Sequence, residues 1–311
     1  MIKKTSPATE EALALRRKKF KHTKSEWLGI ILLCAPAIIH LLVFWLGVQI
    51  ETFKLAFTDH YTQQTGWFNF KWAYEQLTGA ASADIPLAVQ NTFKFFALGC
   101  LLIPISMFFA YLIYRKSFGH GFMRVSLYLP GAIGGIMVSL LYARLMIYDG
   151  PLMSLYSQLT GNDPVMLSSE NGILYIMIHD VLIGVGANLM IWLGGMSRIP
   201  YDLIEVGKLE GIGPFTEFRK VILPLIWPTF VTMFTLQIIN IFGSSGSILA
   251  LTGGADGTNT LAFWMYNMVL QGLSQEYGNV SALGLIFTVV TIPIVVIGRW
   301  FMNKFGEEVE Y

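Results

Sequence analysis

The chain has 311 residues, of which 54% are hydrophobic and only 13% are charged, and its mean hydropathy is +0.56. A typical soluble domain carries about 25% charged residues, so this composition argues against a soluble globular protein, a disordered chain and a nucleic-acid-binding protein. The net charge of +1 creates no overall field that would attract an anionic partner. Both cysteines, Cys34 and Cys100, lie in apolar runs, which excludes a disulfide scaffold and offers no metal-ligand spacing. The composition indicates a polytopic membrane protein.

Six apolar runs are long enough to cross a membrane, since a helix of about 20 apolar residues spans the hydrocarbon. They contain three charged residues: Arg144, Asp180 and Arg299. A further run, Leu261–Leu270, is too short to span and predicts an interfacial or re-entrant helix. We therefore predict an all-α protein with six transmembrane helices. The predicted spans are Trp27–Ile50, Phe95–Tyr114, Val125–Ile147, Ile173–Met196, Val221–Phe242 and Ala282–Phe301.

Basic residues are distributed unequally between the two sides of this topology. Most of the 21 Lys and Arg residues lie before the first span, in the second and fourth loops, and at the C-terminal end. The positive-inside rule therefore predicts that both termini are cytoplasmic. The basic stretch Arg16–Lys24 fits either a lipid-facing topogenic cluster or a partner-binding arm. The predicted parts are a basic N-terminal segment 1–26, a transmembrane domain 27–301 with a cytoplasmic loop at 197–220, and a tail 302–311.

The loop between the fourth and fifth spans predicts a helix, a break and a second helix. Pro200 favours a helix start. From Tyr201 onward, apolar residues recur at roughly helical offsets, with charged residues between them. The segment Gly211–Pro214 breaks this helix, and a second helix is expected from Phe215 into the membrane. A short amphipathic helix of this kind suits the docking of a soluble partner.

At these residues the chain resembles the permease subunits of binding-protein-dependent ABC importers. The family loop runs Glu-Ala-Ala, then a glycine, then Ile-x-Leu-Pro. Here Glu205-Val206-Gly207, Gly211 and Val221–Pro224 stand at those positions. Two stretches in the fifth loop, Leu251–Gly254 and Thr258–Leu261, resemble the sugar-importing members. The resemblance covers the chain from roughly Phe95 to its C-terminus.

The resemblance implies a type I ABC importer permease fold in a bacterial inner or plasma membrane. Its implied partners are a second permease chain, two ATPase subunits and an extracytoplasmic solute-binding protein, and its implied solute is a carbohydrate, with a glycerol phosphate or polyol-like solute as the alternative. The sequence has no phosphate-binding P-loop motif, so we expect ATP and Mg²⁺ on the ATPase, no cofactor on this chain and no enzymatic activity of its own. The competing interpretation is that the loop glycines only end a short helix. The residues assigned to ATPase coupling are Glu205, Val206, Gly207, Glu210, Gly211 and Pro224.

Polar residues within the spans are candidates for the solute path, because they are costly in hydrocarbon unless they serve a function. Gln237, Asn240 and Ser244 recur at offsets of three and four on or just beyond the fifth span. Asn188 and Trp192 share one face of the fourth. The competing interpretation is hydrogen bonding between helices by buried amides.

Three ionisable residues lie on the outer side of the third and fourth spans: Arg144 near the outer end of the third, and His179 and Asp180 in the outer half of the fourth. An ion pair between Arg144 and Asp180 would satisfy both charges, and a gate or solute contact that includes His179 is the alternative. A membrane-embedded enzyme could use His179 and Asp180 as an acid–base pair, but the sequence lacks a positioned nucleophile or metal-binding pattern. A stand-alone secondary carrier usually has several intramembrane ionisable groups, whereas this chain has one acidic residue in mid-span.

Overall fold

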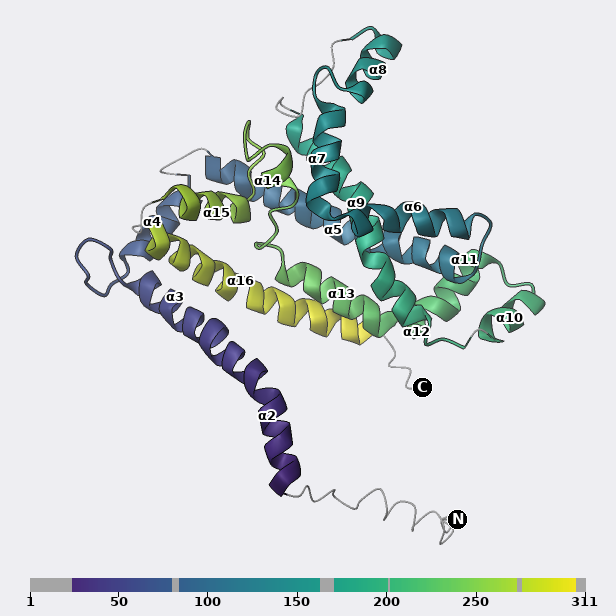
Figure 1. Ribbon diagram of the computed structural model, residues 1–311, viewed down its shortest axis with the longest axis horizontal. Helices are drawn as coiled ribbons and strands as arrows, with labels where there is room; N and C mark the ends of the chain where they lie inside the picture. Colours follow the sequence, from purple (N-terminus) through teal and green to yellow (C-terminus); the bar gives the residue numbers. More distant parts are fainter. Residues whose placement is uncertain (1–23, 80–83, 163–170, 201, 273–275, 306–311) are drawn as a thin grey trace. The chain divides into compact units, whose positions relative to one another are not determined.

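The structure is a computed structural model, shown in Figure 1. Its secondary structure is helical, apart from one isolated bridge between Thr58 and Thr65, throughout the part of the chain that it describes. The chain divides into two units between Lys54 and Leu55, and each is described by itself. The described residues are 24–79, 84–162, 171–200, 202–272 and 276–305, so the basic stretch Arg16–Lys24 lies almost wholly outside them.

The described part of the first unit, from Lys24 onward, consists of helix. Helix α2 (Lys24–His40) continues through a π-helical stretch, η1 (Leu41–Leu46), into α3 (Gly47–Phe57), which ends just inside the second unit. Together they form an apolar run of 31 residues, Trp27–Phe57, that is long enough to span a membrane. The predicted first span is therefore helical, and the helix extends beyond Ile50.

The second unit contains the remaining helices. Its two longest helices are α5 and α16, and α9 is the next. In chain order the bounds are α4 Phe68–Leu77, α5 Asp84–Tyr114, α6 His120–Ile133, α7 Gly135–Met146, α8 Pro151–Thr160, α9 Gly172–Met196, α10 Asp202–Leu209, α11 Pro214–Glu217, η2 Phe218–Ile222, α12 Leu223–Leu225, α13 Trp227–Ile239, α14 Ile248–Leu251, α15 Leu261–Gln271 and α16 Glu276–Phe305.

Helices α5 and α9 pack against each other and form the main core together with η2 and α13 (Figure 1). Tyr111, Leu189 and Trp192 are fully buried in it. A small residue also lets α6 approach α9 closely: a side chain at Gly186 would collide with the carbonyl oxygen of Leu127 on α6. This packing follows the rule that small residues let helix backbones approach closely in membranes.

A second core joins α4, α5, α15 and α16. Ala73, Ile85 and Leu283 are buried there, and the indoles of Trp72 and Trp264 stack with their ring centroids 6.3 Å apart. Trp72 thus packs onto α15, whereas Tyr61, Trp67 and Phe68 are exposed. This arrangement packs α15 against the N-terminal end of α5.

Three further predicted spans and the short helix are confirmed as continuous helices. The second span begins at Asp84 rather than Phe95, the fourth is α9, and the sixth is α16, which extends past the predicted boundary at Phe301 to Phe305. Helix α15 matches the short helix predicted at Leu261–Leu270. Apolar composition and length therefore predicted these elements well.

The third predicted span, Val125–Ile147, is not a single helix. It breaks at Gly134, whose φ of 96° and ψ of 130° lie in a region that residues with a side chain rarely adopt. The helix before the break, α6, packs along α9. The candidate membrane-crossing segment in this region is Gly135–Thr160, which joins α7 and α8.

The fifth predicted span, Val221–Phe242, is a bent pair. The segments Pro214–Leu225 and Trp227–Ile239 meet at 75°, at Ile226. Pro228 has no N–H to donate to the carbonyl four residues earlier, so the helical hydrogen-bond ladder is interrupted at this point. Within the described residues there are five helices that could each cross a membrane, and six spans if the bent pair counts as one.

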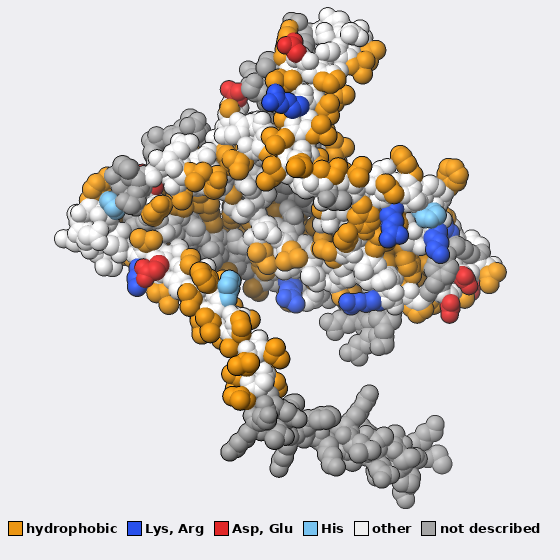
Figure 2. Space-filling view, in the orientation of Figure 1, with side chains coloured by type: hydrophobic (Ala, Val, Ile, Leu, Met, Phe, Trp, Pro, Cys, Tyr) orange, Lys and Arg blue, Asp and Glu red, His pale blue; other side chains and the backbone are white. Residues whose placement is uncertain are grey.

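The surface agrees with a lipid environment. Figure 2 shows hydrophobic side chains spread over much of the face drawn. Large apolar residues such as Leu182, Met190 and Val289 are exposed by 56 to 70% on the long helices. Contiguous exposed apolar surface of this extent marks contact with membrane or with partner proteins.

Candidate functional site

The segment between α9 and α13 has the predicted order of helix, break and helix. Helix α10 buries Ile204 completely and exposes Glu205, Val206 and Leu209. Its outer surface therefore combines apolar side chains with the carboxylates of Glu205 and Glu210, which is also exposed. Figure 2 shows acidic side chains at this end of the molecule, with basic ones nearby.

A glycine ends α10. Gly211 has a φ of +73°, and the Ile212 N–H donates to the Gly207 carbonyl oxygen at 2.9 Å. This pattern is a Schellman C-cap, in which a left-handed residue closes the helix. No atom lies within 4 Å of the position that a Gly211 Cβ would occupy, so backbone conformation and not space requires glycine here. Pro214 then begins α11.

Both ends of this segment are attached to the last turn of α5. The Tyr114 hydroxyl donates to the Ile199 carbonyl oxygen at 2.9 Å, just after α9. The Tyr111 hydroxyl lies 2.9 Å from both the Pro214 carbonyl oxygen and Glu217 Oε1, so its one hydrogen is shared between two acceptors. We call residues 197–220 the coupling segment, after the role that the sequence predicts for it.

A buried carboxylate strengthens the second attachment. The Glu217 side chain is 1% exposed, and its Oε2 lies 3.3 Å from Arg115 Nε. The two groups are not aligned for a hydrogen bond, so the contact is an ion pair. Arg115 is itself only 17% exposed. A buried charge is costly unless it is paired, so Arg115 and Tyr111 together keep Glu217 in place.

Sequence reasoning missed these anchors. Tyr111, Tyr114 and Arg115 are spaced three and four residues apart, which places them on one face of the end of α5, and this spacing was the available signal. Pro224, assigned to coupling, lies in α12 directly before the 75° bend.

The predicted path residues are not gathered at one site. Gln237 on α13 lies in contact with Gly99 of α5. Asn240 is exposed beyond the end of α13, and its side-chain N–H donates to Leu236 O at 2.9 Å. Ser244 is exposed in the turn that follows, so it is not on the helix.

Two cavities flank these residues. The first, of about 490 Å³, lies between α13 and α16 and is lined mainly by apolar groups, with the hydroxyls of Thr288 and Thr291. The second, of about 610 Å³, lies between α6 and α9, next to Asn188 in the chain, and its lining includes Arg124 and Tyr128.

Trp192 occupies a different setting from Asn188. Asn188 is half-buried, whereas Trp192 is fully buried and its indole N–H donates to Ser106 Oγ at 3.0 Å. Trp192 therefore joins α9 to α5 in the core and presents no surface to a solute in this conformation.

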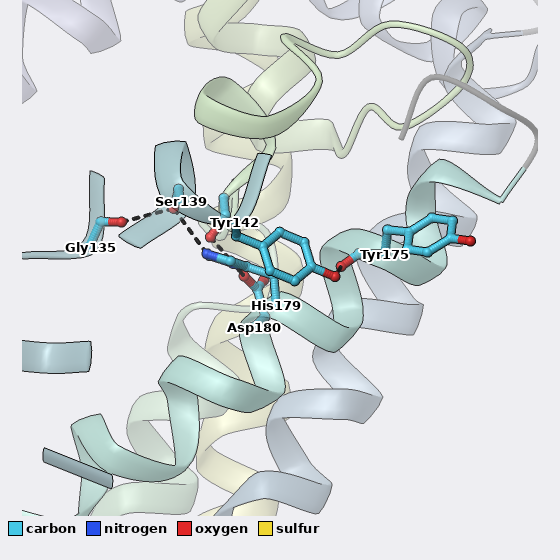
Figure 3. Close-up of polar contacts among 7 residues, drawn as sticks. Gly135, Ser139, Tyr142, Tyr175, His179 and Asp180 are labelled. Atoms are coloured by element: carbon cyan, nitrogen blue, oxygen red, sulfur yellow. Dashed lines mark hydrogen bonds and ion pairs between the residues drawn. The ribbon is translucent and has the colours of Figure 1, made fainter. Parts of the chain in front are cut away.

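The polar cluster on α9 differs from the predicted ion pair (Figure 3). Asp180 Oδ1 accepts a hydrogen bond from Ser247 Oγ at 2.7 Å and lies 3.1 Å from His179 Nδ1. The ion pairs of the described residues do not include Arg144 with Asp180, and Arg144 is exposed. The prediction of that pair is wrong, because a hydroxyl and an imidazole already satisfy the carboxylate.

His179 connects α9 to α7. It is 1% exposed, and its Nε2 lies 3.1 Å from Ser139 Oγ, which also donates to Gly135 O at 2.8 Å. The two ring nitrogens thus bridge Asp180 on α9 and Ser139 on α7, with donor and acceptor roles that depend on the tautomer of the ring. Tyr142 covers the ring, with centroids 5.0 Å apart (Figure 3).

This arrangement of apolar helices around buried cores, with an exposed amphipathic helix between α9 and α13, defines a multi-pass integral membrane protein. Residues 77–310 match the family described as the binding-protein-dependent transport system inner membrane component. The chain belongs to this family, whose members are ABC transporter permease components and not enzymes.

Individual relatives are distant in sequence but cover most of the chain. The probable starch degradation products transport system permease protein AmyD of Thermoanaerobacterium thermosulfurigenes is 25% identical over 91% of this chain and 96% of its own length. The multiple sugar-binding transport system permease protein MsmF of Streptococcus mutans is 25% identical over 65% of this chain and 70% of its own. A bacterial ABC transporter involved in the import of the acidic polysaccharide alginate shares the fold, with a TM-score of 0.77, 20% identity, and coverage of 91% of this chain and 98% of that one.

Proposed function

We propose that this chain is the permease subunit of an ATP-driven importer for a carbohydrate of the oligosaccharide class, and that it forms half of a translocation pore with a second permease chain. Two ATPase subunits bind ATP and Mg²⁺ and dock on the coupling segment. A solute-binding protein delivers the sugar from outside. Both termini lie in the cytoplasm.

The observation that carries this proposal is the geometry of α10. A helix of eight residues is exposed on one side, is closed by the left-handed Gly211, and is held at both ends by buried contacts to α5. Exposed Val206 and Leu209 offer apolar contacts to a soluble partner, and Glu205 and Glu210 favour a basic rim on that partner.

The relatives support a carbohydrate. AmyD and MsmF are named for starch products and multiple sugars, and the alginate transporter imports a polysaccharide. The cavity between α6 and α9 offers a phenol ring at Tyr128, and Asn188 adjoins it, which are groups that suit stacking on and hydrogen bonding to a sugar.

The docking side is tested with a single cysteine. Val206→Cys, in a chain with Cys34→Ser and Cys100→Ala, places a thiol on the exposed surface of α10. We expect a membrane-impermeant maleimide to label it in inside-out vesicles but not in intact cells, and co-expressed ATPase to protect it. Labelling in intact cells, or no protection in vesicles that contain copurifying ATPase, contradicts the proposed docking.

The solute is tested by uptake. This chain is reconstituted with the ATPase, second permease and binding protein that neighbouring genes encode. Four radiolabelled solutes are then offered in turn: maltooligosaccharides, galactooligosaccharides, alginate oligosaccharides and sn-glycerol 3-phosphate. We expect ATP-dependent uptake of an oligosaccharide. Uptake of glycerol phosphate alone favours the alternative, a polyol-type solute.

A further inference from the structure

Helix α5 is fastened by buried side chains at both of its ends. We propose that α5 is a rigid rod that transmits movement of the coupling segment to the loop 252–260 at its opposite end. This inference rests on the proposed function, in which an ATPase moves the coupling segment. With 31 residues, α5 is about 46 Å long at 1.5 Å per residue, which is enough to connect the two faces of a membrane.

At one end α5 holds both stems of the coupling segment. Tyr114 bonds to Ile199 at its start, and Tyr111 and Arg115 hold Pro214 and Glu217 near its end. Because one turn of α5 holds both stems, a displacement of the segment between them carries that turn with it. Figure 1 shows α11 beside this end of α5.

At the other end α5 holds the loop before α15. Asn91 is 1% exposed, and its side-chain amide donates both hydrogens, to Gly257 O at 2.7 Å and to Asn259 O at 2.9 Å. The buried Thr92 hydroxyl accepts from the Leu261 N–H at 3.0 Å. These bonds join positions more than 160 residues apart in the chain, so they serve tertiary and not local structure.

The loop has a fixed shape and can therefore respond as one body. Thr252 Oγ1 and Thr258 Oγ1 are 2.7 Å apart, and the Thr258 hydroxyl donates to Ala255 O at 2.7 Å. Thr258 and Thr260 are fully buried. A shift of the α5 end is thus transferred to the loop's backbone instead of being absorbed by it.

Helix α13 is a less direct route. It follows the coupling segment in the chain, but the chain bends by 75° at Ile226 before α13 begins. Helix α9 leads into the coupling segment without a break, and its Asp180 is tied to Ser247, before the loop 252–260 begins. Helix α5 stays continuous through Pro104, and the bond from Trp192 to Ser106 supports it two residues later. A continuous helix that its neighbours support transmits displacement along its length, whereas a bend in the chain can absorb the displacement.

The test places a reporter in the outer loop. Ala255 is exposed, and Ala255→Cys is introduced into the chain that carries Cys34→Ser and Cys100→Ala. The whole complex is then reconstituted. Labelling by an impermeant maleimide is timed with and without ATP plus vanadate. We expect the labelling rate to change by about fivefold or more, the lower end of ordinary coupling between two sites.

The rod is then weakened at each end. In Asn91→Ala, which lies far from the coupling segment, we expect the nucleotide-dependent change to fall below about twofold, while ATPase copurification and basal ATP hydrolysis persist. In Glu217→Gln with Tyr111→Phe we expect the same loss, measured in complexes matched for ATPase content and for ATP hydrolysis. A variant that combines the substitutions at both ends of α5 should show no further loss of the nucleotide-dependent change, because each end is needed for the same transmission. Tyr74→Phe, on an exposed tyrosine of α4, is the matched control. Should the double variant fail to insert, Tyr114→Phe removes one anchor and leaves Glu217 paired.

The outcomes separate the two proposals. A full nucleotide-dependent change in all the weakened variants overturns the rod and leaves the importer intact. Absence of any change in the unweakened reporter chain, in a complex that contains ATPase and hydrolyses ATP, also overturns the rod. Failure of this chain to assemble with any ATPase overturns the proposed function itself.

Discussion

Ser247 Oγ donates to Asp180 Oδ1 over 2.7 Å, which ties the start of α14 to α9. The adjacent Gly246 has a φ of +52°, and a Cβ there would lie 2.9 Å from Asp180 Oδ2. The carboxylate therefore sits against backbone and receives its hydrogen bonds through one oxygen. This contact links the helix that precedes the coupling segment to the loop that follows α13.

Removal of this bond should lower stability. Because hydrogen bonds to charged groups contribute about 1.5 to 3 kcal/mol, we expect Ser247→Ala to destabilise the purified protein by an amount in this range. Asp180→Asn should cost a similar amount, and the double variant should cost less than the sum. The measurement is thermal unfolding in detergent. Asp149→Asn, on an exposed carboxylate, is the control, and equal melting temperatures for all variants would refute the role of the bond.

The break after α10 should depend on backbone conformation alone. Gly211 and Gly213 both have open space at the Cβ position, but only Gly211 has a positive φ, while Gly213 has a φ of −66°. We expect Gly211→Ala to cost about 1 to 2 kcal/mol locally and Gly213→Ala almost nothing. Hydrogen exchange of the α10 amides measures this difference. Equal protection in the two variants would show that the left-handed residue is not required.

The ATPase-coupling assignment predicts a separation of insertion from transport. Glu205→Lys reverses an exposed charge on α10, and Gly211→Pro cannot adopt the observed φ. Both variants should reach the membrane in normal amounts, and ATP-coupled uptake should fall at least about tenfold, the effect of roughly 1.4 kcal/mol. Immunoblots of membranes and uptake assays check the two parts. Normal uptake in both variants would sink the assignment.

The contact between α6 and α9 should be intolerant of side chains. A Cβ at Gly186 would overlap the carbonyl oxygen of Leu127, a backbone atom that cannot rotate away, whereas Gly194 on the same helix faces open space. Overpacking of this kind costs about 1 to 3 kcal/mol. We expect Gly186→Ala to lower the melting temperature and Gly194→Ala to leave it nearly unchanged. The reverse order would contradict the packing described for α9.

Residues that contact the solute and residues that pack in the core should differ in their effects on the KM of uptake and on thermal stability. If Asn240 contacts the sugar, Asn240→Ala raises the KM of uptake and leaves thermal stability unchanged, because its side chain is exposed. Trp192→Phe removes a buried hydrogen bond to Ser106 and should lower stability instead. Thr232→Ala, exposed on the same helix as Gln237, is the control. An unchanged KM in Asn240→Ala and Gln237→Ala would remove both from the solute path.

Apolar length predicted where helices lie but not where they break. Prolines occur in most spans, and Pro36, Pro104 and Pro293 lie inside continuous helices. The chain breaks instead at Gly134 and near Pro228. Neighbouring helices decide whether a proline is accommodated, and a single sequence does not contain that information.

The local part of the candidate site was predictable and the long-range part was not. The α10 helix and the Gly211 cap depend on adjacent residues, so the pattern indicated both. The contact of Tyr111 with Glu217 joins positions 106 residues apart, and it depends on how α5 packs. Likewise, charge alone favoured Arg144 as the partner of Asp180, but the fold brings Ser247 to it instead.

The most direct test is ATP-dependent uptake by the reconstituted complex of this chain with its ATPase, second permease and binding protein. We predict accumulation of a labelled oligosaccharide inside proteoliposomes only when ATP is present on the side that α10 faces. Omission of the ATPase should abolish the uptake. ATP-independent uptake by this chain alone would contradict an ATP-driven importer.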